Sequence, residues 1–108
     1  MGTIDKDLVK TQLTQRVEAV CKHLLPTGRR KGKEWAIGDV CGTAGESLKV
    51  QLEGPKAGLW RDFSAQEGGD LLALWQRARR LSFADALKEA AQWLGGGYEV
   101  EGLRTAYR

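Results

Sequence analysis

The spacing of apolar residues along this chain changes from helical to alternating and back to helical. Between Ile4 and Leu25 the apolar side chains recur at the spacing of one helix face. Leu48, Val50 and Leu52 then alternate with polar residues, the pattern of a strand with one buried face. Helical spacing returns beyond residue 70. The sequence therefore predicts an α+β fold, in which a small antiparallel sheet is flanked by one N-terminal and two C-terminal helices.

Start and stop signals set the limits of these elements. The first helix is expected over residues 5–25, with Thr3 or Asp5 as its cap and Pro26 just beyond its end. Three strands that form a meander are expected at residues 34–37, 47–53 and 59–63. The second and third helices are expected at residues 70–80 and 82–94.

A chain of 108 residues is long enough for one domain. We expect that domain to cover residues 1–95, followed by a linker or tail at 96–108, where residues 98–100 have the sequence of a short strand. No stretch is apolar enough to cross a bilayer, and the first residues lack the apolar core of a signal peptide. These features predict a cytoplasmic protein without membrane contact, and the break after residue 95 is consistent with either a fragment of a larger protein or a small free-standing one.

The few soft ligands argue against a metal centre. The chain has two cysteines, Cys21 and Cys41, and one histidine, His23, so a four-ligand zinc site would also need a carboxylate. Phosphate-binding and dinucleotide-binding glycine motifs are absent from the sequence. We therefore expect no metal, no cofactor and no catalysis by this chain alone.

Charge is unevenly distributed along the chain. Residues 1–33 carry eight basic and three acidic side chains, whereas residues 34–70 carry three and seven. The basic excess peaks in residues 28–33, Gly-Arg-Arg-Lys-Gly-Lys, which we expect to be a loop. Such a loop is either a solvated turn or a contact for the phosphates of a nucleic acid, and its composition leaves both interpretations open.

Residues 58–74 carry the most specific pattern: an aromatic and a basic residue, Trp60 and Arg61, precede Glu67-Gly68-Gly69-Asp70 and an apolar helix. Residues 81–87, Leu-Ser-Phe-Ala-Asp-Ala-Leu, follow. Together with the strand that starts at Ser47, this order resembles the zinc-ribbon domain at the N-terminus of bacterial and phage DNA primases, over about residues 34–94. It is most similar to the zinc-less versions on primase-helicases of phages and mobile elements.

The chain departs from that family at the metal ligands. Asp62 and Ala65 stand where the ribbon has one pair of cysteines, and the upstream pair of ligands has no counterpart. Bound metal supplies much of the folding free energy of such domains. We expect an aromatic core to replace it, with burial of each ring contributing roughly 2–3 kcal/mol; its members would be Trp35, Trp60, Phe63, Trp75, Phe83 and Trp93.

The two glycines in residues 67–70 have a predicted structural role. Gly68 and Gly69 are expected to form a sharp turn with positive φ between a strand and the second helix. Asp70 is expected to cap that helix.

The resemblance implies a template-binding function in DNA replication. We expect a non-catalytic domain of a DNA primase or primase-helicase that binds single-stranded DNA, with cations for the phosphates and tryptophans that either stack on bases or fill the core. The candidate residues are Arg29, Arg30, Lys31, Lys33, Trp35, Lys49, Trp60, Arg61, Arg77, Arg79 and Arg80. The alternative is a protein-interaction domain that docks a helicase, a polymerase or the catalytic part of a primase, for which an apolar stripe should be exposed on the first or third helix.

Overall fold

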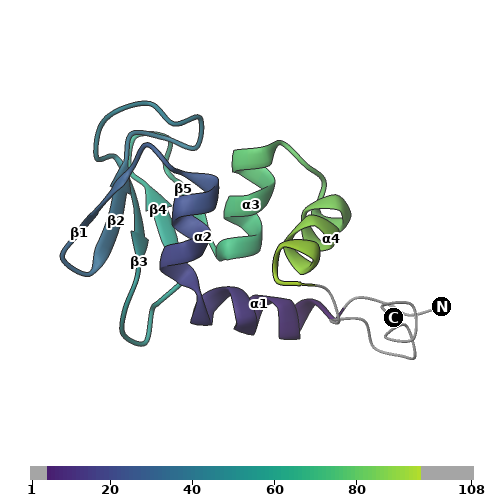
Figure 1. Cartoon of the computed structure of the whole chain (residues 1–108). Coiled ribbons are helices and arrows are strands. Elements are labelled where there is room, and N and C mark those ends of the chain that lie inside the picture. Colours follow the sequence, from purple (N-terminus) through teal and green to yellow (C-terminus); the bar gives the residue numbers. More distant parts are fainter. Residues whose placement is uncertain (1–4, 96–108) are drawn as a thin grey trace.

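The structure, a computed structural model, describes residues 5–95 and has a sheet on one side and four helices on the other (Figure 1). The α+β class is confirmed. The sheet has five strands instead of the expected three, and all neighbours are antiparallel in the order β1-β2-β3-β4-β5. The strands are β1 Arg29–Lys31, β2 Glu34–Ile37, β3 Leu48–Gln51, β4 Trp60–Asp62 and β5 Glu67–Gly69.

Strand β1 replaces the expected basic loop. A two-residue turn joins it to β2, and Gly32 in that turn has φ +64°, a value that favours glycine. The extended backbone places Arg29 and Lys31 on one side of the strand and Arg30 on the other. Alternation therefore separates the cations, so this stretch does not need to be a loop.

Strand β5 replaces the expected glycine turn. Neither Gly68 nor Gly69 has positive φ, and the positive φ of this region lies at Gln66, with +54°. A Cβ atom added to Gly68 would lie 2.5 Å from the carbonyl oxygen of Trp60 on the neighbouring strand. Glycine is required here for close approach of two strands, not for a sharp turn.

The expected first helix is two helices, α1 Lys6–Gln15 and α2 Val17–Leu24. The chain leaves helical geometry at Arg16, with φ −123° and ψ 34°, and α2 continues in a new direction (Figure 1). The break allows the apolar stripes of both helices to face one core. Asp5 caps α1, because its carboxylate accepts the backbone N–H groups of Asp7 and Leu8.

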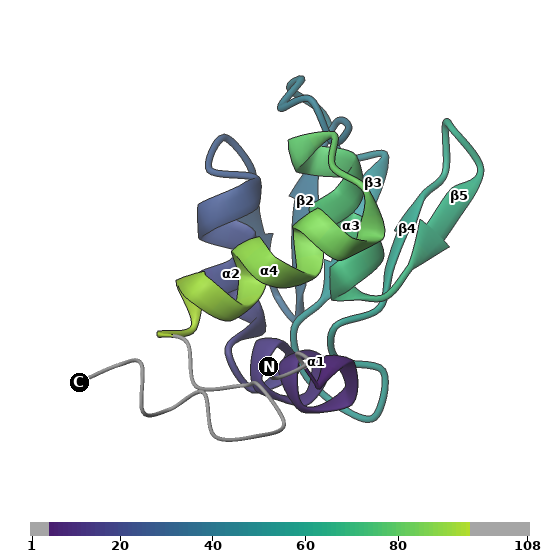
Figure 2. The same cartoon turned by 90° about the vertical axis from the view of Figure 1, so that its right-hand side faces the viewer.

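The C-terminal helices, α3 Leu71–Arg79 and α4 Phe83–Trp93, lie where the sequence predicts them. The Asp70 carboxylate accepts the N–H of Ala73, and the Ser82 hydroxyl accepts the N–H of Asp85, so both expected caps are confirmed. Helix α3 contacts β5, α1, α2 and α4 and thus occupies the centre of the helical layer (Figure 2).

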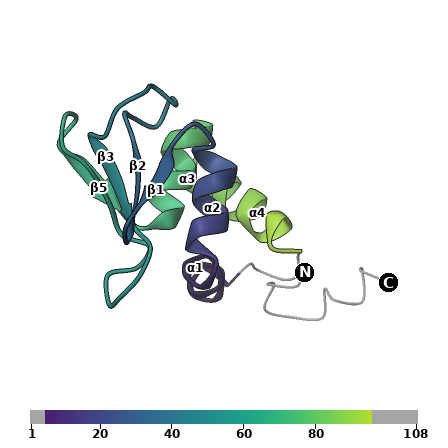
Figure 3. The same cartoon turned by 60° about the vertical axis from the view of Figure 1, so that its left-hand side comes forward.

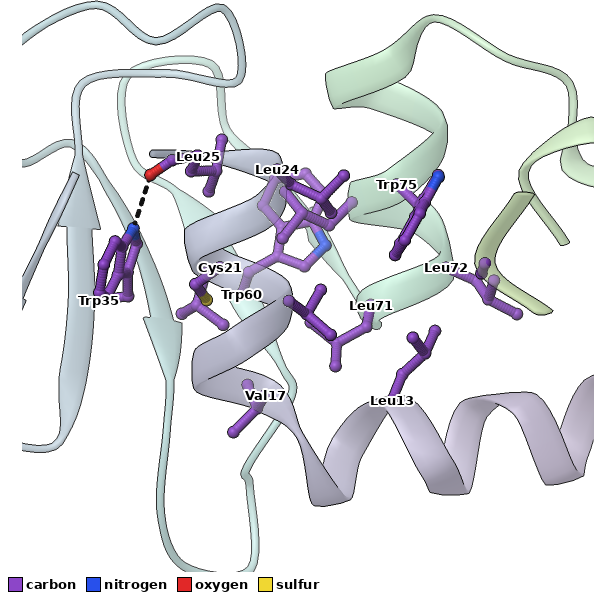
Figure 4. Close-up of a cluster of buried hydrophobic side chains, with 14 of the residues drawn as sticks. Leu13, Val17, Cys21, Leu24, Leu25, Trp35, Trp60, Leu71, Leu72 and Trp75 are labelled. Carbon is purple, nitrogen blue, oxygen red and sulfur yellow. Dashed lines mark hydrogen bonds between the residues drawn. The ribbon is translucent and has the colours of Figure 1, made fainter. Parts of the chain in front are cut away.

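Buried tryptophans join the sheet to the helices and one helix to another (Figure 4). Trp75 is fully buried, and Trp35 and Trp60 are each 5% exposed. Every one of these indole N–H groups has an acceptor: the carbonyl of Leu25 for Trp35, the carbonyl of Asp70 for Trp60 and the carboxylate of Glu89 for Trp75. The aromatic core is smaller than expected, because Phe63 and Phe83 are exposed.

The tail expected at residues 96–108 and its short strand lie outside the described residues. Among residues 5–95, no helix has the length and apolar character needed to cross a membrane.

The two thiols should differ sharply in reactivity. Cys21 is fully buried, and burial, together with the charge of Glu18, raises its pKa to about 12, whereas Cys41 is exposed. Because the thiolate is the reactive form, we expect Ellman's reagent to titrate Cys41 rapidly in the native protein and Cys21 only after unfolding. Rapid reaction of both thiols under native conditions would contradict this arrangement of the core.

Substitutions in the β4–β5 hairpin test the role of Gly68. Gly68→Ala should lower the free energy of unfolding by about 1–3 kcal/mol, because its Cβ would be forced against backbone. Gln66→Gly should change it by less than about 1 kcal/mol, because relief of the positive φ offsets the added chain entropy. Urea denaturation measures both values, and equal effects would show that close packing at Gly68 is unimportant.

Candidate nucleic-acid interface

The helices cover one face of the sheet and leave the other uncovered (Figure 3). Along β3, Leu48 and Val50 are fully buried towards the helices, while the alternating residues Lys49 and Gln51 are partly exposed. In β4, likewise, Trp60 and Asp62 are buried and Arg61 is exposed. We call the uncovered side of the sheet the open face.

Three basic residues form a row across the open face. The strand register aligns Arg29, Ala36, Lys49, Arg61 and Gly68 in successive strands, and Ala36, between the two long basic side chains, is only 3% exposed. Residues directly opposite each other project from the same face of a sheet. Because neighbouring strands lie about 4.8 Å apart, cations occur at three points along a line that crosses the sheet. We call Arg29, Lys49 and Arg61 the basic row.

An exposed aromatic ring lies beside the basic row. Phe63 follows Arg61 by two residues and is 62% exposed. The Arg61 guanidinium carbon lies 5.7 Å from the centroid of the Phe63 ring, within cation–π range. Phe63 was expected in the core, so the sequence interpretation missed it as a site residue. Its spacing from the outward-facing Arg61 is the signal that could have revealed it.

Acidic side chains pair with some of these cations. The Glu34 carboxylate lies 3.9 Å from the Lys49 ammonium, and Glu46 lies 2.6 Å from that of Lys31. Lys31 belongs to the same face, two residues from Arg29. Within residues 5–95, Arg29 and Arg61 form no ion pair, so their charges remain available to an external anion.

The basic side chains of the open face lower the pKa of Glu46. Its hydrogen bond with Lys31 and the charge of Lys31 hold the pKa of its carboxyl below the usual value. The charges of Lys49 and Arg29 act in the same direction, although desolvation opposes them. The Glu46 carboxylate therefore interacts electrostatically with three of the basic side chains on this face.

Arg30 is bound by acidic side chains of its own chain and does not lie on the open face. Its guanidinium forms ion pairs with Glu18 of α2, at 2.7 Å, and with Glu53, and its Nε donates to the carbonyl of Gly32. The hydrogen bonds with Glu53 and Glu18 raise its pKa. Arg30 therefore ties α2 to the sheet edge, whereas its neighbour Lys33 lies exposed in the β1–β2 turn.

The two candidate tryptophans face the helices. Trp35 and Trp60 align with Val50 across the sheet, on the face opposite the basic row. Their burial and their hydrogen bonds to backbone carbonyls leave no ring surface for a base in this structure. Of the two roles that the sequence left open, their placement corresponds to core packing.

The three arginines near the end of α3 lie apart from the basic row. Arg77 pairs with Glu67 at 2.9 Å, and Arg79 pairs at 2.7 Å with Glu89, the carboxylate that also accepts the Trp75 indole. Arg80 donates to the sulfur of Cys41 at 3.9 Å. The structure thus does not unite these arginines with the open face.

A pocket of about 370 Å³ lies beside the end of α3, and its lining includes Arg77, Arg80, Thr27 and Cys41. The C-terminal end of α2 also borders it, through Leu24. The carbonyl groups at helix C-termini disfavour anions. The partial negative charges at the ends of α2 and α3 therefore reduce the positive potential of the two arginines, in contrast to the basic row.

Comparison of the chain with protein-family models, with curated proteins and with solved structures found no match in any of the three.

Removal of the Arg30 side chain should lower the thermal stability of the protein. Arg30→Ala leaves Glu18 and Glu53 without their shared partner, so the melting temperature should fall. Lys33→Ala, which removes the same charge from the adjacent turn, should leave it nearly unchanged. Thermal unfolding followed by circular dichroism measures the difference, and equal melting temperatures for the two variants would exclude the structural role of Arg30.

Proposed function

We propose that this chain is a non-catalytic module that binds single-stranded DNA on the open face of its sheet, in the manner of the template-binding domain of a DNA primase or primase-helicase. The observation that carries the proposal is the basic row with the exposed Phe63 ring beside it. Cations in a line follow a phosphate backbone, and a neighbouring ring offers a surface on which a base can stack.

The geometry favours a single strand over a duplex. A ring on a sheet surface can stack only on a base whose own face is accessible, which a base pair within a duplex does not offer. Phe63 is held in position by its backbone N–H, which donates to the carbonyl of Ser47 at 2.9 Å, and by its contact with Arg61. The backbone bond fixes the point from which the ring projects, and a fixed anchor lowers the entropic cost of stacking.

The resemblance to primase ribbons implies that Asp62 takes the place of a metal ligand. This residue stands at a cysteine position of the ribbon and is 3% exposed. Its carboxylate accepts the N–H and hydroxyl groups of Ser64 and the N–H of Ala65. A hydrogen-bonded carboxylate thus organises the β4–β5 turn, and we infer that it replaces a metal ligand there.

Docking of a protein partner is the second function considered. Among the described residues, Leu8 is the exposed large apolar side chain of α1, and Phe83 is that of α4. Within residues 5–95, the other large apolar side chains of α1, α2 and α4 are buried or half-buried, so this alternative has less structural support than the nucleic-acid proposal.

Fluorescence anisotropy with a labelled oligothymidylate tests the proposal. Phe63→Ala should weaken binding by about 5- to 100-fold, the effect of losing one stacked base. Arg61→Ala should weaken it and reduce the slope of log K against log salt by about 0.7, the change expected for one phosphate contact on a single strand.

Matched controls on the helical layer are Phe83→Ala and Lys88→Ala, which remove an exposed ring and an exposed cation from α4. Both should bind the oligonucleotide like the wild type. Absence of binding by the folded wild type at low salt, or equal losses in the control variants, would refute the open face as the binding surface.

A further inference from the structure

The loop that joins β2 to β3, residues 38–47, brings an anion to the proposed binding face. The Glu46 carboxylate lies 2.6 Å from the Lys31 ammonium, and it is close enough to Lys49 and Arg29 for their charges to favour its ionised form. Lys31 and Glu46 are both about half exposed. A phosphate oxygen that approached Lys31 would have to compete with this carboxylate.

We propose that Glu46 is an internal competitor for the nucleic-acid phosphate, and that a bound strand takes its place at Lys31. This inference rests on the proposed function of the open face. Carboxylate and phosphate oxygens present the same kind of acceptor to a lysine ammonium. Because Glu46 belongs to the same chain, its effective concentration at Lys31 is high, and only a ligand with several phosphates can displace it efficiently.

The backbone of the loop is anchored on both sides of Glu46, so only the side chain of Glu46 has to move to release Lys31. The Asp39 carboxylate accepts the N–H groups of Cys41 and Thr43, and the Gly38 N–H donates to the carbonyl of Thr43. A Cβ atom at Gly38 would lie 2.4 Å from that same carbonyl oxygen, so the base of the loop is tightly packed.

The residue before Glu46 is Gly45, whose φ is +140°, and a Cβ atom there would lie 3.2 Å from the Cα atom of Gly38, so Gly45 belongs to the packed base. Within the described residues, the side chain of Glu46 is hydrogen bonded to Lys31 alone. Release of Glu46 therefore breaks one exposed ion pair and leaves the anchored base of the loop intact.

The experiment compares Glu46→Gln with Asp85→Asn, which removes a negative charge from α4 and so raises the net charge equally. Binding of the labelled oligothymidylate is measured at low and at moderate salt. Glu46→Gln should bind about two- to five-fold more tightly than wild type at low salt, the range of an exposed ion pair. The gain should diminish at higher salt, because exposed charges are screened. Asp85→Asn should stay near the wild type.

The double variant Lys31→Ala/Glu46→Gln identifies the site of competition. In the Lys31→Ala background, most of the gain from Glu46→Gln should disappear, because the cation that the carboxylate blocks is absent. If wild type binds while Glu46→Gln matches Asp85→Asn, or if the gain persists in full without Lys31, the competitor role is wrong and the binding face stands. If folded wild type and Glu46→Gln both fail to bind at low salt, the proposed function and this inference fail together.

Discussion

The fold depends on the burial of one face of the sheet beneath α2 and α3 through tryptophan side chains. Trp35 and Trp60 project from the sheet, and their indole N–H groups donate to backbone carbonyls at the end of α2 and the start of α3. Each ring thus contributes apolar burial and also fixes where a helix ends or begins. An unpaired buried N–H would cost about 1–3 kcal/mol, so these two bonds restrict the helices to one position on the sheet.

The apolar side chains on the inner face of the sheet determine which side chains lie on its outer face. Because side chains alternate along a strand, placing Leu48, Val50 and Trp60 inward forces Lys49 and Arg61 outward. The register then brings residues from three strands into one line. The basic row therefore requires no special loop: it follows from alternation within strands whose other face carries the core.

The sequence predicts best those features that depend on local patterns. The strand at residues 34–37, helices α3 and α4 and the caps Asp70 and Ser82 follow from short-range periodicity and capping chemistry. The break at Arg16 and the added strands β1 and β5 depend instead on long-range packing, which single-sequence patterns do not contain. The same limit explains the site. The composition of the sequence predicts the four open-face cations, but the spacing of Phe63 from Arg61 identifies the ring only once the outward direction of Arg61 is known.

Gly68 and Asp62 stabilise the β4–β5 hairpin without contributing large apolar side chains. Gly68 lets β5 approach the backbone of Trp60, and Asp62 satisfies three donors of the following turn from a buried position. Both act through backbone geometry, so their effects do not depend on the size of neighbouring side chains. Because β4 also carries Arg61 and leads directly to Phe63, the same local constraints that hold this hairpin hold the cation and the ring of the proposed binding face. The placement of the site is therefore a consequence of how the hairpin folds, and a chain that lost the hairpin geometry would misplace both groups at once.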